Sequence, residues 1–378
     1  MKYKLGDIAT FSQGKQIEID EQFLKKDENH SIRFIRIVDY TNPEEPIRYV
    51  KNYGERYYAT ENEVIMIRYG SQTAGKVVMG KNGIIANNMF KMNFDNSIIK
   101  NKYAYYYLSQ DRIFNYLRSS QSSSTMPAIS FGMLNDFVID IPEIRTQEKV
   151  IALLDIIDKI INYNAHTNNN LYETFRSIYK NTFLNKTTNT IKFSDFNEIG
   201  SLVMGQSPKG SSYNEEKIGL PLINGAADYK DGMLNPNKYT SEPTRVCNAK
   251  DLVFCIRATI GQLTIADQEY CLGRGVACIS NINELYYEYV FNIIEESIDK
   301  LKAVATGSVI LGLSKDDINN LEVYKPTLEE IKKFHKLEQP ILNRIIEIKK
   351  QNKTLEQIRD TLLPKLMNGE IDLEKIEI

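Results

Sequence analysis

The sequence predicts an α+β fold in which two duplicated mixed α/β domains are separated by two long helices that form an antiparallel coiled coil. Three observations predict this fold. Residues 143–185 contain neither proline nor glycine and repeat apolar residues at helical spacing. The same spacing returns 184 residues later in the chain. The segments that precede the two helical stretches also follow one another in the same order.

The two helical stretches share one heptad phase. The predicted seam positions of the first helix are Val150, Leu154, Ile157, Ile161, Asn164, Asn168, Leu171, Phe175, Ile178 and Thr182. Those of the second helix are Phe334, Glu338, Ile341, Ile345, Ile348, Asn352, Leu355, Arg359, Leu362 and Leu366. Seven of the ten positions are apolar in each helix, where the average composition of the chain would supply about four.

Polar residues interrupt the seam, and at one position they match between the two copies. Asn168 and Asn352 fall on the same seam position of the two copies. We expect these residues to fix the register of the helix pair, because a buried Asn is satisfied only opposite a polar group. Pro340 is expected to kink the second helix or to start it anew, since proline removes a backbone donor.

The first domain is predicted to occupy residues 1–142 and the second residues 186–326, with the helices at 143–185 and, together with a C-terminal tail, at 327–378. Short β-branched or alternating runs between Gly and Asn turns predict strands in the first domain. They are residues 33–38, 63–68, 76–79, 89–94 and 137–142. Tyr and apolar residues at helical spacing predict one helix over residues 98–118, before a serine-rich loop at 119–125.

The second domain repeats motifs of the first. Residues 192–205 echo residues 2–14 and align Gly205 with Gly14. Residues 222–229 end in Asp-Tyr, as residues 34–40 do, and the strands predicted over 63–68 and 253–257 both end in arginine, at Arg68 and Arg257. The globular copies have diverged further than the helices, which keep their phase.

Composition excludes several classes of protein. A hydrophobic content of 42% and a charged content of 25% are typical of a globular chain, and the net charge of −2 argues against a histone-like basic protein. No apolar run reaches membrane-spanning length, and the first residues lack the apolar core of a signal peptide. We therefore expect a cytoplasmic protein that does not bind a membrane.

The four cysteines all lie in the second half of the chain and form no CxxC pair. They are Cys247, Cys255, Cys271 and Cys278. A cytoplasmic chain keeps them reduced. Four thiols so close together are an alternative zinc site, but the first copy of the duplication has no cysteine, so the fold does not need them. No metal is expected.

Several segments together resemble the DNA-specificity subunit of type I restriction-modification systems. The segments are LGDIATFSQGK (5–15), TMPAIS (125–130), IPEIRTQEKVIALLDIID (141–158), YKPTLEEIKKF (324–334) and, most specific of all, TLLPKLMNGEIDL (361–373). The resemblance covers the whole chain and its duplicated order. Where family members commonly carry Gly-Ser before TMPAIS, this chain has Ser123-Ser124, whereas the second copy keeps Gly307-Ser308.

The resemblance implies a non-catalytic subunit that reads a bipartite, asymmetric DNA target and holds two methyltransferase subunits and, through them, the restriction subunits. It implies no cofactor in this chain, with S-adenosylmethionine, ATP and Mg²⁺ on the partners. A two-fold arrangement of readers would contact two half-sites separated by a spacer. The alternative function is a coiled-coil adaptor that binds proteins and does not recognise DNA.

An enzyme is a third reading, and its best motif is weak. Residues 70–76 (GSQTAGK) satisfy GxxxxGK, but a P-loop needs a following Ser or Thr and a helix, whereas Val77-Val78-Met79 reads as a strand. A polar turn between two strands fits better. His30, His166 and His335 form no recognisable acid/base pair, so no catalytic residue is expected.

Polar side chains on turns that follow strands are the predicted DNA contacts, because Arg, Gln and Asn pair with base edges and Lys with phosphate. The first choices are Arg68, Ser71, Gln72, Lys76, Arg257, Thr259 and Gln262. The second choices are Asn87, Asn88, Ser124, Thr125, Arg274 and Ser308.

Overall fold

The computed structural model describes residues 1–42, 45–70, 73–119, 128–305 and 312–373. The chain divides into two compact units, one made of Met1–Ile160 with Leu355–Ile378 and the other of Ile161–Thr354. Each unit therefore contains one globular domain and a segment of both long helices. None of the helices in the described ranges combines the length and apolar character that a membrane span requires.

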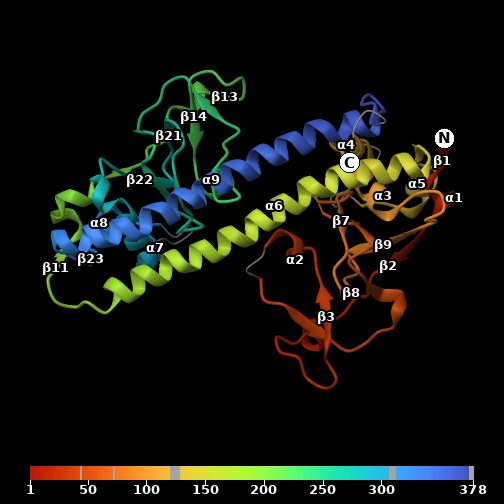
Figure 1. Cartoon of the computed structure of the whole chain (residues 1–378), viewed down its shortest axis with the longest axis horizontal. Helices are drawn as coiled ribbons and strands as arrows, with labels where there is room; N and C mark the ends of the chain where they lie inside the picture. Colours follow the sequence, from red (N-terminus) through yellow and green to blue (C-terminus); the bar gives the residue numbers. More distant parts are fainter. Residues whose placement is uncertain (43–44, 71–72, 120–127, 306–311, 374–378) are drawn as a thin grey trace. The chain divides into compact units, whose positions relative to one another are not determined.

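The first domain consists of two stacked sheets (Figure 1). Its strands are β1 (Lys2–Lys4), β2 (Ala9–Gln13), β3 (Ile32–Ile35), β4 (Arg48–Val50), β5 (Tyr58–Ala59), β6 (Val64–Ile67), β7 (Val77–Met79), β8 (Gly83–Ile85), β9 (Met89–Phe94) and β10 (Val138–Asp140). One sheet has the order β2-β9-β6-β7 and the other β4-β3-β8-β5, while β1 pairs with β10. In the second sheet β3 and β8 run parallel.

Strand β6 is buried on both faces, which explains its continuous apolar sequence. Val64 and Met66 pack with the helices, whereas Ile65 and Ile67 pack against the second sheet. Alternate residues of a strand point to opposite faces, so a strand between two layers needs apolar residues at every position. The helices that pack on the face of Val64 and Met66 include the start of α6 (Ile144–Tyr179). Strands β3 and β8 lie on the opposite face of the sheet (Figure 1).

The second domain repeats this layering. Its strands are β11 (Thr190–Lys192), β12 (Ser201–Met204), β13 (Tyr213–Asn214), β14 (Leu220–Ile223), β15 (Tyr229–Lys230), β16 (Met233–Leu234), β17 (Tyr239–Thr240), β18 (Val246–Cys247), β19 (Leu252–Cys255), β20 (Leu263–Ile265), β21 (Tyr270–Leu272), β22 (Val276–Ser280) and β23 (Glu322–Tyr324). The order β12-β22-β19-β20 matches β2-β9-β6-β7, and β14 pairs with β21 in parallel as β3 does with β8. The duplication predicted from the sequence is therefore present in the fold.

The shorter helices differ from the prediction in one place. The shorter ones are α1 (Leu5–Ile8), α2 (Val38–Thr41), α3 (Asn101–Leu108), α4 (Asp111–Ser119), α5 (Phe131–Asn135), α7 (Tyr287–Val304) and α8 (Lys315–Asn319). The single helix predicted over 98–118 is thus two helices. They are separated at Gln110, whose buried side chain donates to the carbonyl of Tyr107. This side-chain bond occupies a carbonyl at the end of α3.

The second long helix, α9 (Leu328–Met367), continues through Pro340, so of the two predicted outcomes the helix does not start anew there. Pro340 and Lys336, one turn earlier, are both exposed. Water can therefore satisfy the carbonyl that loses its backbone partner, so the proline is tolerated on this face. The first long helix, α6, ends in a π-helical turn over Lys180–Leu184.

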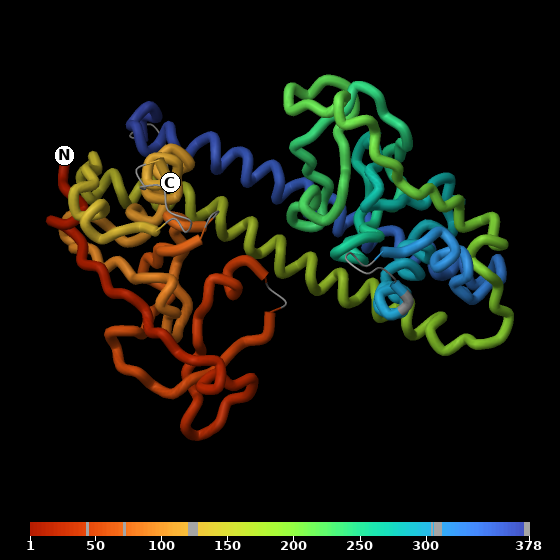
Figure 2. Tube along the Cα trace, turned by 180° about the vertical axis from the view of Figure 1, so that it is seen from behind, coloured from red at the N-terminus to blue at the C-terminus, as the bar shows by residue number. Residues whose placement is uncertain are grey.

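Within each compact unit, α6 and α9 run antiparallel. In the first unit Val150 and Leu154 share a core with Leu363 and Leu366, where the end of the chain returns to the first domain (Figure 2). In the second unit Asn164 bonds to Asn352, and Asn168 to the carbonyl of Ile345. As the residue number increases along α6, the residues it contacts on α9 have decreasing numbers, which is the antiparallel arrangement. All twenty predicted seam positions are buried or half-buried, which confirms the coiled coil.

Candidate nucleic-acid interface

Each domain has a short turn between its parallel strand and the next strand of the central sheet. The turn lies at residues 86–88, between β8 and β9, and at 273–275, between β21 and β22. The amide of Ala86 donates to Ile35 O at 2.9 Å, and that of Gly273 to Ile223 O at 2.7 Å. The carbonyl oxygens of Asn88 and Gly275 also accept equivalent bonds. Asn88 O accepts from Arg68 N at 2.8 Å, and Gly275 O accepts from Ile256 N at 2.9 Å. Asn87 and Arg274 therefore occupy the same position of the fold.

The matched glycines Gly14 and Gly205 hold these turns close to the neighbouring strands β2 and β12. A Cβ atom on Gly14 would stand 2.2 Å from Ala86 O, and one on Gly205 would stand 2.1 Å from Gly273 O. No other residue type fits such an approach without moving the turn. The equivalence of the two glycines read from the sequence is confirmed.

Two chains of hydrogen bonds in the first domain converge on Asn87, which is half-buried. Its side-chain Nδ2 donates to Gln16 Oε1 at 3.0 Å, and Gln16 Nε2 donates to Glu18 Oε1 at 2.9 Å. Its carbonyl accepts a bond of 2.6 Å from Gln13 Nε2. Because a carboxylate only accepts, Glu18 sets the orientation of both amides and leaves Asn87 Oδ1 turned away from Gln16.

Arg68 supports this network from inside the domain. Its Nη1 donates to Gln13 Oε1, and its guanidinium lies 5.1 Å from the ring centroids of both Tyr69 and Phe131. The side chain is half-buried and its Nε atom is enclosed. Held between two rings, Arg68 positions Gln13 and through it the carbonyl of Asn87.

The strand-end arginines Arg68 and Arg257 are not equivalent, contrary to the match made from the sequence. The amide of Ile67 donates to Lys76 O, and that of Cys255 makes the corresponding bond to Gln262 O. Arg257 therefore corresponds to Tyr69. A shift of one residue along a strand reverses the side-chain direction, which is why Arg68 packs inside its domain while Arg257 is exposed.

The remaining candidates lie on exposed turns where the structure describes them. Lys76 is exposed, with its ammonium 5.9 Å from the Phe114 ring, and Thr259 and Gln262 are exposed on the β19–β20 turn. Arg274 is exposed, and its backbone N donates to Ser207 Oγ at 3.5 Å. The candidates Ser71, Gln72, Ser124, Thr125 and Ser308 lie outside the described residues.

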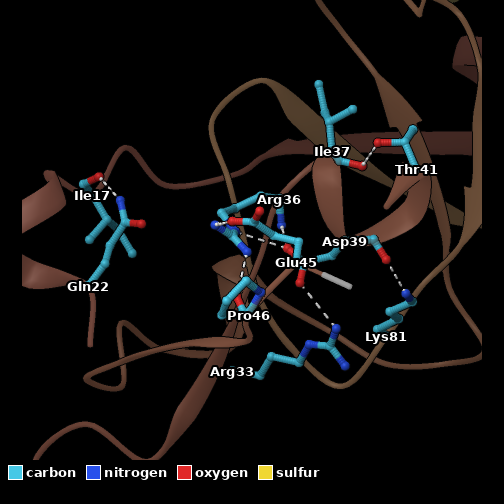
Figure 3. Close-up of polar contacts among 10 residues, drawn as sticks. All are labelled: Ile17, Gln22, Arg33, Arg36, Ile37, Asp39, Thr41, Glu45, Pro46 and Lys81. Atoms are coloured by element: carbon cyan, nitrogen blue, oxygen red, sulfur yellow. Dashed lines mark hydrogen bonds and ion pairs between the residues drawn. The ribbon is translucent and has the colours of Figure 1, made fainter. Parts of the chain in front are cut away.

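An opening of about 610 Å³ in the first domain adjoins Asn87 and was not predicted. Its polar lining includes Gln16, Gln22, Arg36, Thr41, Asn87 and Asn88. Beside it, Arg36 is fixed by Nε to Asp39, Nη1 to Glu45 at 2.9 Å and Nη2 to the carbonyl of Pro46 at 2.9 Å (Figure 3). These residues follow no periodic pattern, and the one available signal was that Gln13 and Gln16 flank the matched Gly14.

The Asp-Tyr motif shared by the two domains has a structural role next to this opening. The carboxylate of Asp39 is 1% exposed and accepts bonds from Arg36 N at 2.8 Å and Arg33 Nη2 at 3.2 Å. Asp228 accepts corresponding backbone bonds, from Asn224 N at 2.6 Å and Gly225 N at 3.2 Å. Lys81 donates to Asp39 O (Figure 3), and burial together with Arg33 lowers its pKa.

Residues 70–76, which match a phosphate-binding loop, connect the antiparallel strands β6 and β7. A phosphate-binding loop requires a helix after the last glycine, and here β7 follows. The nucleotide-binding interpretation is therefore wrong, and the described residues of this segment, 70 and 73–76, lie between two strands as predicted.

The four cysteines pack in the interior of the second domain, on strands β18, β19, β21 and β22. Burial raises the pKa of Cys247, Cys255 and Cys278 to about 12, so these thiols stay protonated at neutral pH. No group of His, Cys, Asp and Glu in the described part of the chain has the arrangement of a metal site.

Polar seam residues differ in how well they are satisfied. Asn352 Oδ1 accepts from Asn164 Nδ2 at 2.8 Å, and Asn352 Nδ2 donates to Ile161 O at 3.2 Å. Asn168 donates to Ile345 O at 3.3 Å, but its buried Oδ1 has no protein partner. Asn164 was thus missed as the residue that faces Asn352. Glu338 is fully buried, and burial next to Glu288 raises its pKa to about 8.

The fold and the two equivalent turns define a class: proteins with two copies of one α/β domain, each followed by a long helix of a shared coiled coil. The family of type I restriction modification DNA specificity domains matches residues 1–173 and 185–359. The chain belongs to this family, whose members recognise DNA targets and assemble with other subunits. Because they are specificity subunits, the expectation that the chain is not an enzyme is confirmed.

Individual relatives agree with this membership. The putative type I restriction enzyme MjaX specificity subunit of Methanocaldococcus jannaschii is 28% identical over 297 residues, covering 72% of this chain and 69% of that protein. The MjaIX specificity subunit of the same organism is 23% identical over 330 residues, or 80% and 76% of the two chains. The crystal structure of the S subunit from M. genitalium matches with a TM-score of 0.57 at 16% identity, over 97% of this chain and 95% of that one, which shows the shared fold.

Proposed function

We propose that the chain reads a bipartite, asymmetric target on double-stranded DNA, with one half-site contacted by each domain. The observation that supports this proposal is the equivalent turn that carries different side chains in the two domains. Asn87 corresponds to Arg274, and the residue beneath it changes from Gln16 to Ser207. One fold that presents different donors and acceptors reads different base sequences.

The long helices are proposed to set the spacer between the half-sites. The 36 residues of α6 correspond to a rod of about 54 Å. Such a rod has the dimensions needed to keep two readers more than a turn of DNA apart. Its seam is closed by apolar residues and by the Asn164–Asn352 bond, which resist sliding of one helix along the other.

The helices are also the proposed docking surface for two methyltransferase subunits and, through them, the restriction subunits. On α6, Ile156 and Ile160 are 47% and 38% exposed and lie four residues apart, on one face of the helix. An apolar pair outside the seam favours a protein partner. S-adenosylmethionine, ATP and Mg²⁺ would be bound by those partners in the cytoplasm, with no cofactor in this chain.

The salt dependence of duplex binding separates this proposal from a protein adaptor without DNA recognition. We expect the affinity of the full chain in complex with its methyltransferase subunits to fall steeply with salt, because each phosphate contact releases a counterion. Competition with unrelated duplex DNA serves as the control for sequence preference. Binding that is absent, or equal for all sequences, would favour the adaptor.

A further inference from the structure

The turn after the parallel strand makes the same backbone bonds in the two domains but carries different polar side chains. Ala86 and Gly273 make the same backbone bonds, and Gly14 and Gly205 make the same close approach. The side chains of the turn differ, Ala86-Asn87-Asn88 against Gly273-Arg274-Gly275, and at the centre of the turn an amide is replaced by a guanidinium. A conserved backbone with an exchanged polar side chain is the arrangement expected of a specificity position.

We infer that Asn87 contacts an adenine in the half-site of the first domain and that Arg274 contacts a guanine in the half-site of the second. The inference rests on the proposed function of the chain as a DNA reader and names the residue of each domain that selects a base. It concerns these two side chains alone and makes them specificity-determining residues.

The bonds around Asn87 leave free the pair of groups that adenine requires. Its Nδ2 uses one hydrogen for Gln16 Oε1, and its Oδ1 faces away from Gln16. The second hydrogen and the oxygen can therefore meet N7 and the N6 amino group of adenine at the same time. Glu18 fixes this orientation through Gln16, since the reversed amides would place oxygen against oxygen. The amide is therefore preorganised for one base edge.

Neighbouring polar side chains are occupied within the domain. Arg68 is held between two rings and bonds to Gln13, and Arg36 uses Nε, Nη1 and Nη2 for internal acceptors. The Oδ1 atom of Asn88 is enclosed by protein. Asn87 is thus the side chain of this turn that retains both a donor and an acceptor.

Arg274 offers a different pattern. The side chain is exposed and carries donors only, which match the two acceptors N7 and O6 of guanine. Its backbone N is 3.5 Å from Ser207 Oγ, where the first domain has the Gln16 contact. Serine is too short to orient a guanidinium as Gln16 orients an amide. The second domain therefore depends on the fork geometry of arginine itself.

The test exchanges the two side chains in the full chain bound to its methyltransferase subunits. Bound duplexes are selected from a random pool and sequenced, and methylated adenines are mapped in parallel. Asn87→Arg should replace adenine by guanine at one position of one half-site, and Arg274→Asn should make the opposite change in the other half. Discrimination at each position should change by roughly 10- to 100-fold. Asn82→Arg, at the exposed opposite end of β8, is the matched control and should leave the motif unchanged.

The possible results separate the inference from the function on which it rests. The inference is overturned if the native complex has a bipartite motif and Asn87→Arg leaves that motif intact, or changes only the half read by the second domain. The proposed function stands in either case. A native complex without sequence preference overturns the proposed function. If the arginine variant does not assemble, Asn87→Ala replaces it and should abolish the preference at that one position. An Asn87→Ala complex with the native motif would also overturn the inference.

Discussion

At the scale of single residues, the inferred contact of Asn87 with adenine depends on the orientation of one amide. Glu18 accepts from Gln16, and Gln16 accepts from Asn87. Each hydrogen bond fixes which way the next amide is oriented. The carboxylate of Glu18, which is not on the turn itself, therefore determines which atoms of Asn87 face outward. Glu18 is accordingly a positioning residue.

Changing Glu18→Gln should weaken base discrimination by the first domain. A glutamine can accept or donate, so Gln16 and Asn87 become free to flip and the Asn87 amide is no longer held in one orientation. We expect the preference for adenine at its position to fall a few-fold while overall affinity stays near native, as measured with duplexes that differ at that base pair. Glu28→Gln, at an exposed site of the same domain, is the control. An unchanged preference in the Glu18 variant would show that the orientation of Asn87 does not depend on Glu18.

The sequence located part of this site and missed the rest for a physical reason. Gly14, Gly205, Asn87 and Arg274 were recognised, because glycines and polar residues mark turns. Gly14 meets the turn of Asn87 through the pairing of β2 with β9 and the bridge between Lys15 and Ala86, and Gly205 meets the turn of Arg274 through β12 and β22; these pairings join distant residues and leave no local pattern. The false match of Arg68 with Arg257 arose because both strands end in Ile-Arg, and a one-residue offset is invisible until the hydrogen-bond register is known.

At the scale of elements, the coiled coil is the part that the sequence predicted best. Heptad spacing is local information, and every predicted seam position is buried or half-buried. The spacing does not say which polar residues meet across the seam. Asn168 and Asn352 were expected to set the register, and the residue that bonds to Asn352 is Asn164, four residues before Asn168. The cost of burying Glu338 likewise depends on the neighbours that α7 supplies.

The two seam asparagines should respond differently to leucine. Asn168→Leu removes an unpaired buried oxygen and should stabilise the chain by about 1 kcal/mol. Asn352→Leu removes one of the two acceptors of Asn164 Nδ2, the other being Gln351 Oε1 at 3.1 Å, together with the donor to Ile161 O, and should destabilise the chain by about 1 kcal/mol. Denaturant unfolding of the two variants measures both effects. The double variant with both leucines should blur the spacer of the methylated motif, because the register is then set by apolar contacts alone. Equal effects of the two single changes would contradict the pairing.

Glu338 should make the stability of the second unit depend on pH. Burial and the neighbouring Glu288 raise the pKa of Glu338 from its usual 4.5 to about 8, and His335 bonds to Glu288 at 2.7 Å. Because the unfolded chain releases this proton near pH 4.5, the native state loses stability as the pH rises from about 4.5 to about 8 and levels off above that. Each unit of pKa shift corresponds to about 1.4 kcal/mol.

Replacing Glu338 by Gln should therefore stabilise the chain by a margin that grows between pH 5 and pH 8. Leu154, the residue at the same seam position of the first copy, shows that the site accepts an uncharged side chain. Chemical denaturation at the two pH values gives the margin, and Glu347→Gln, at an exposed position of α9, is the control. The same margin at both pH values would show that Glu338 is ionised in the native state already at pH 5.

At the scale of the whole molecule, the helices and the domains are proposed to have separate tasks, namely the spacer and the half-sites. Deleting residues 157–163 together with residues 353–359 removes one heptad from each helix at the junction of the two units. The deletion keeps the Asn164–Asn352 bond and removes Asp158 together with Arg359, its partner at 3.1 Å. Each helix shortens by about 10 Å, so the spacer should shrink by up to roughly three base pairs.

The half-sites should stay the same in that variant, because neither domain is altered. A deletion of three residues from α6 alone shifts the seam out of phase and should lower the stability of the chain instead. An active in-phase variant with the native spacer would leave the helices as a docking surface only.

Two independent readers in one chain can be detected by mapping methylated adenines across a genome exposed to the chain with its methyltransferase subunits. We expect one motif with two unlike half-sites and an unread spacer of fixed length. Exchanging residues 1–142 for the corresponding domain of a relative should change one half-site and leave the other half-site and the spacer as they were. A continuous motif, or an exchange that alters both half-sites, would contradict a chain that reads DNA with two independent domains.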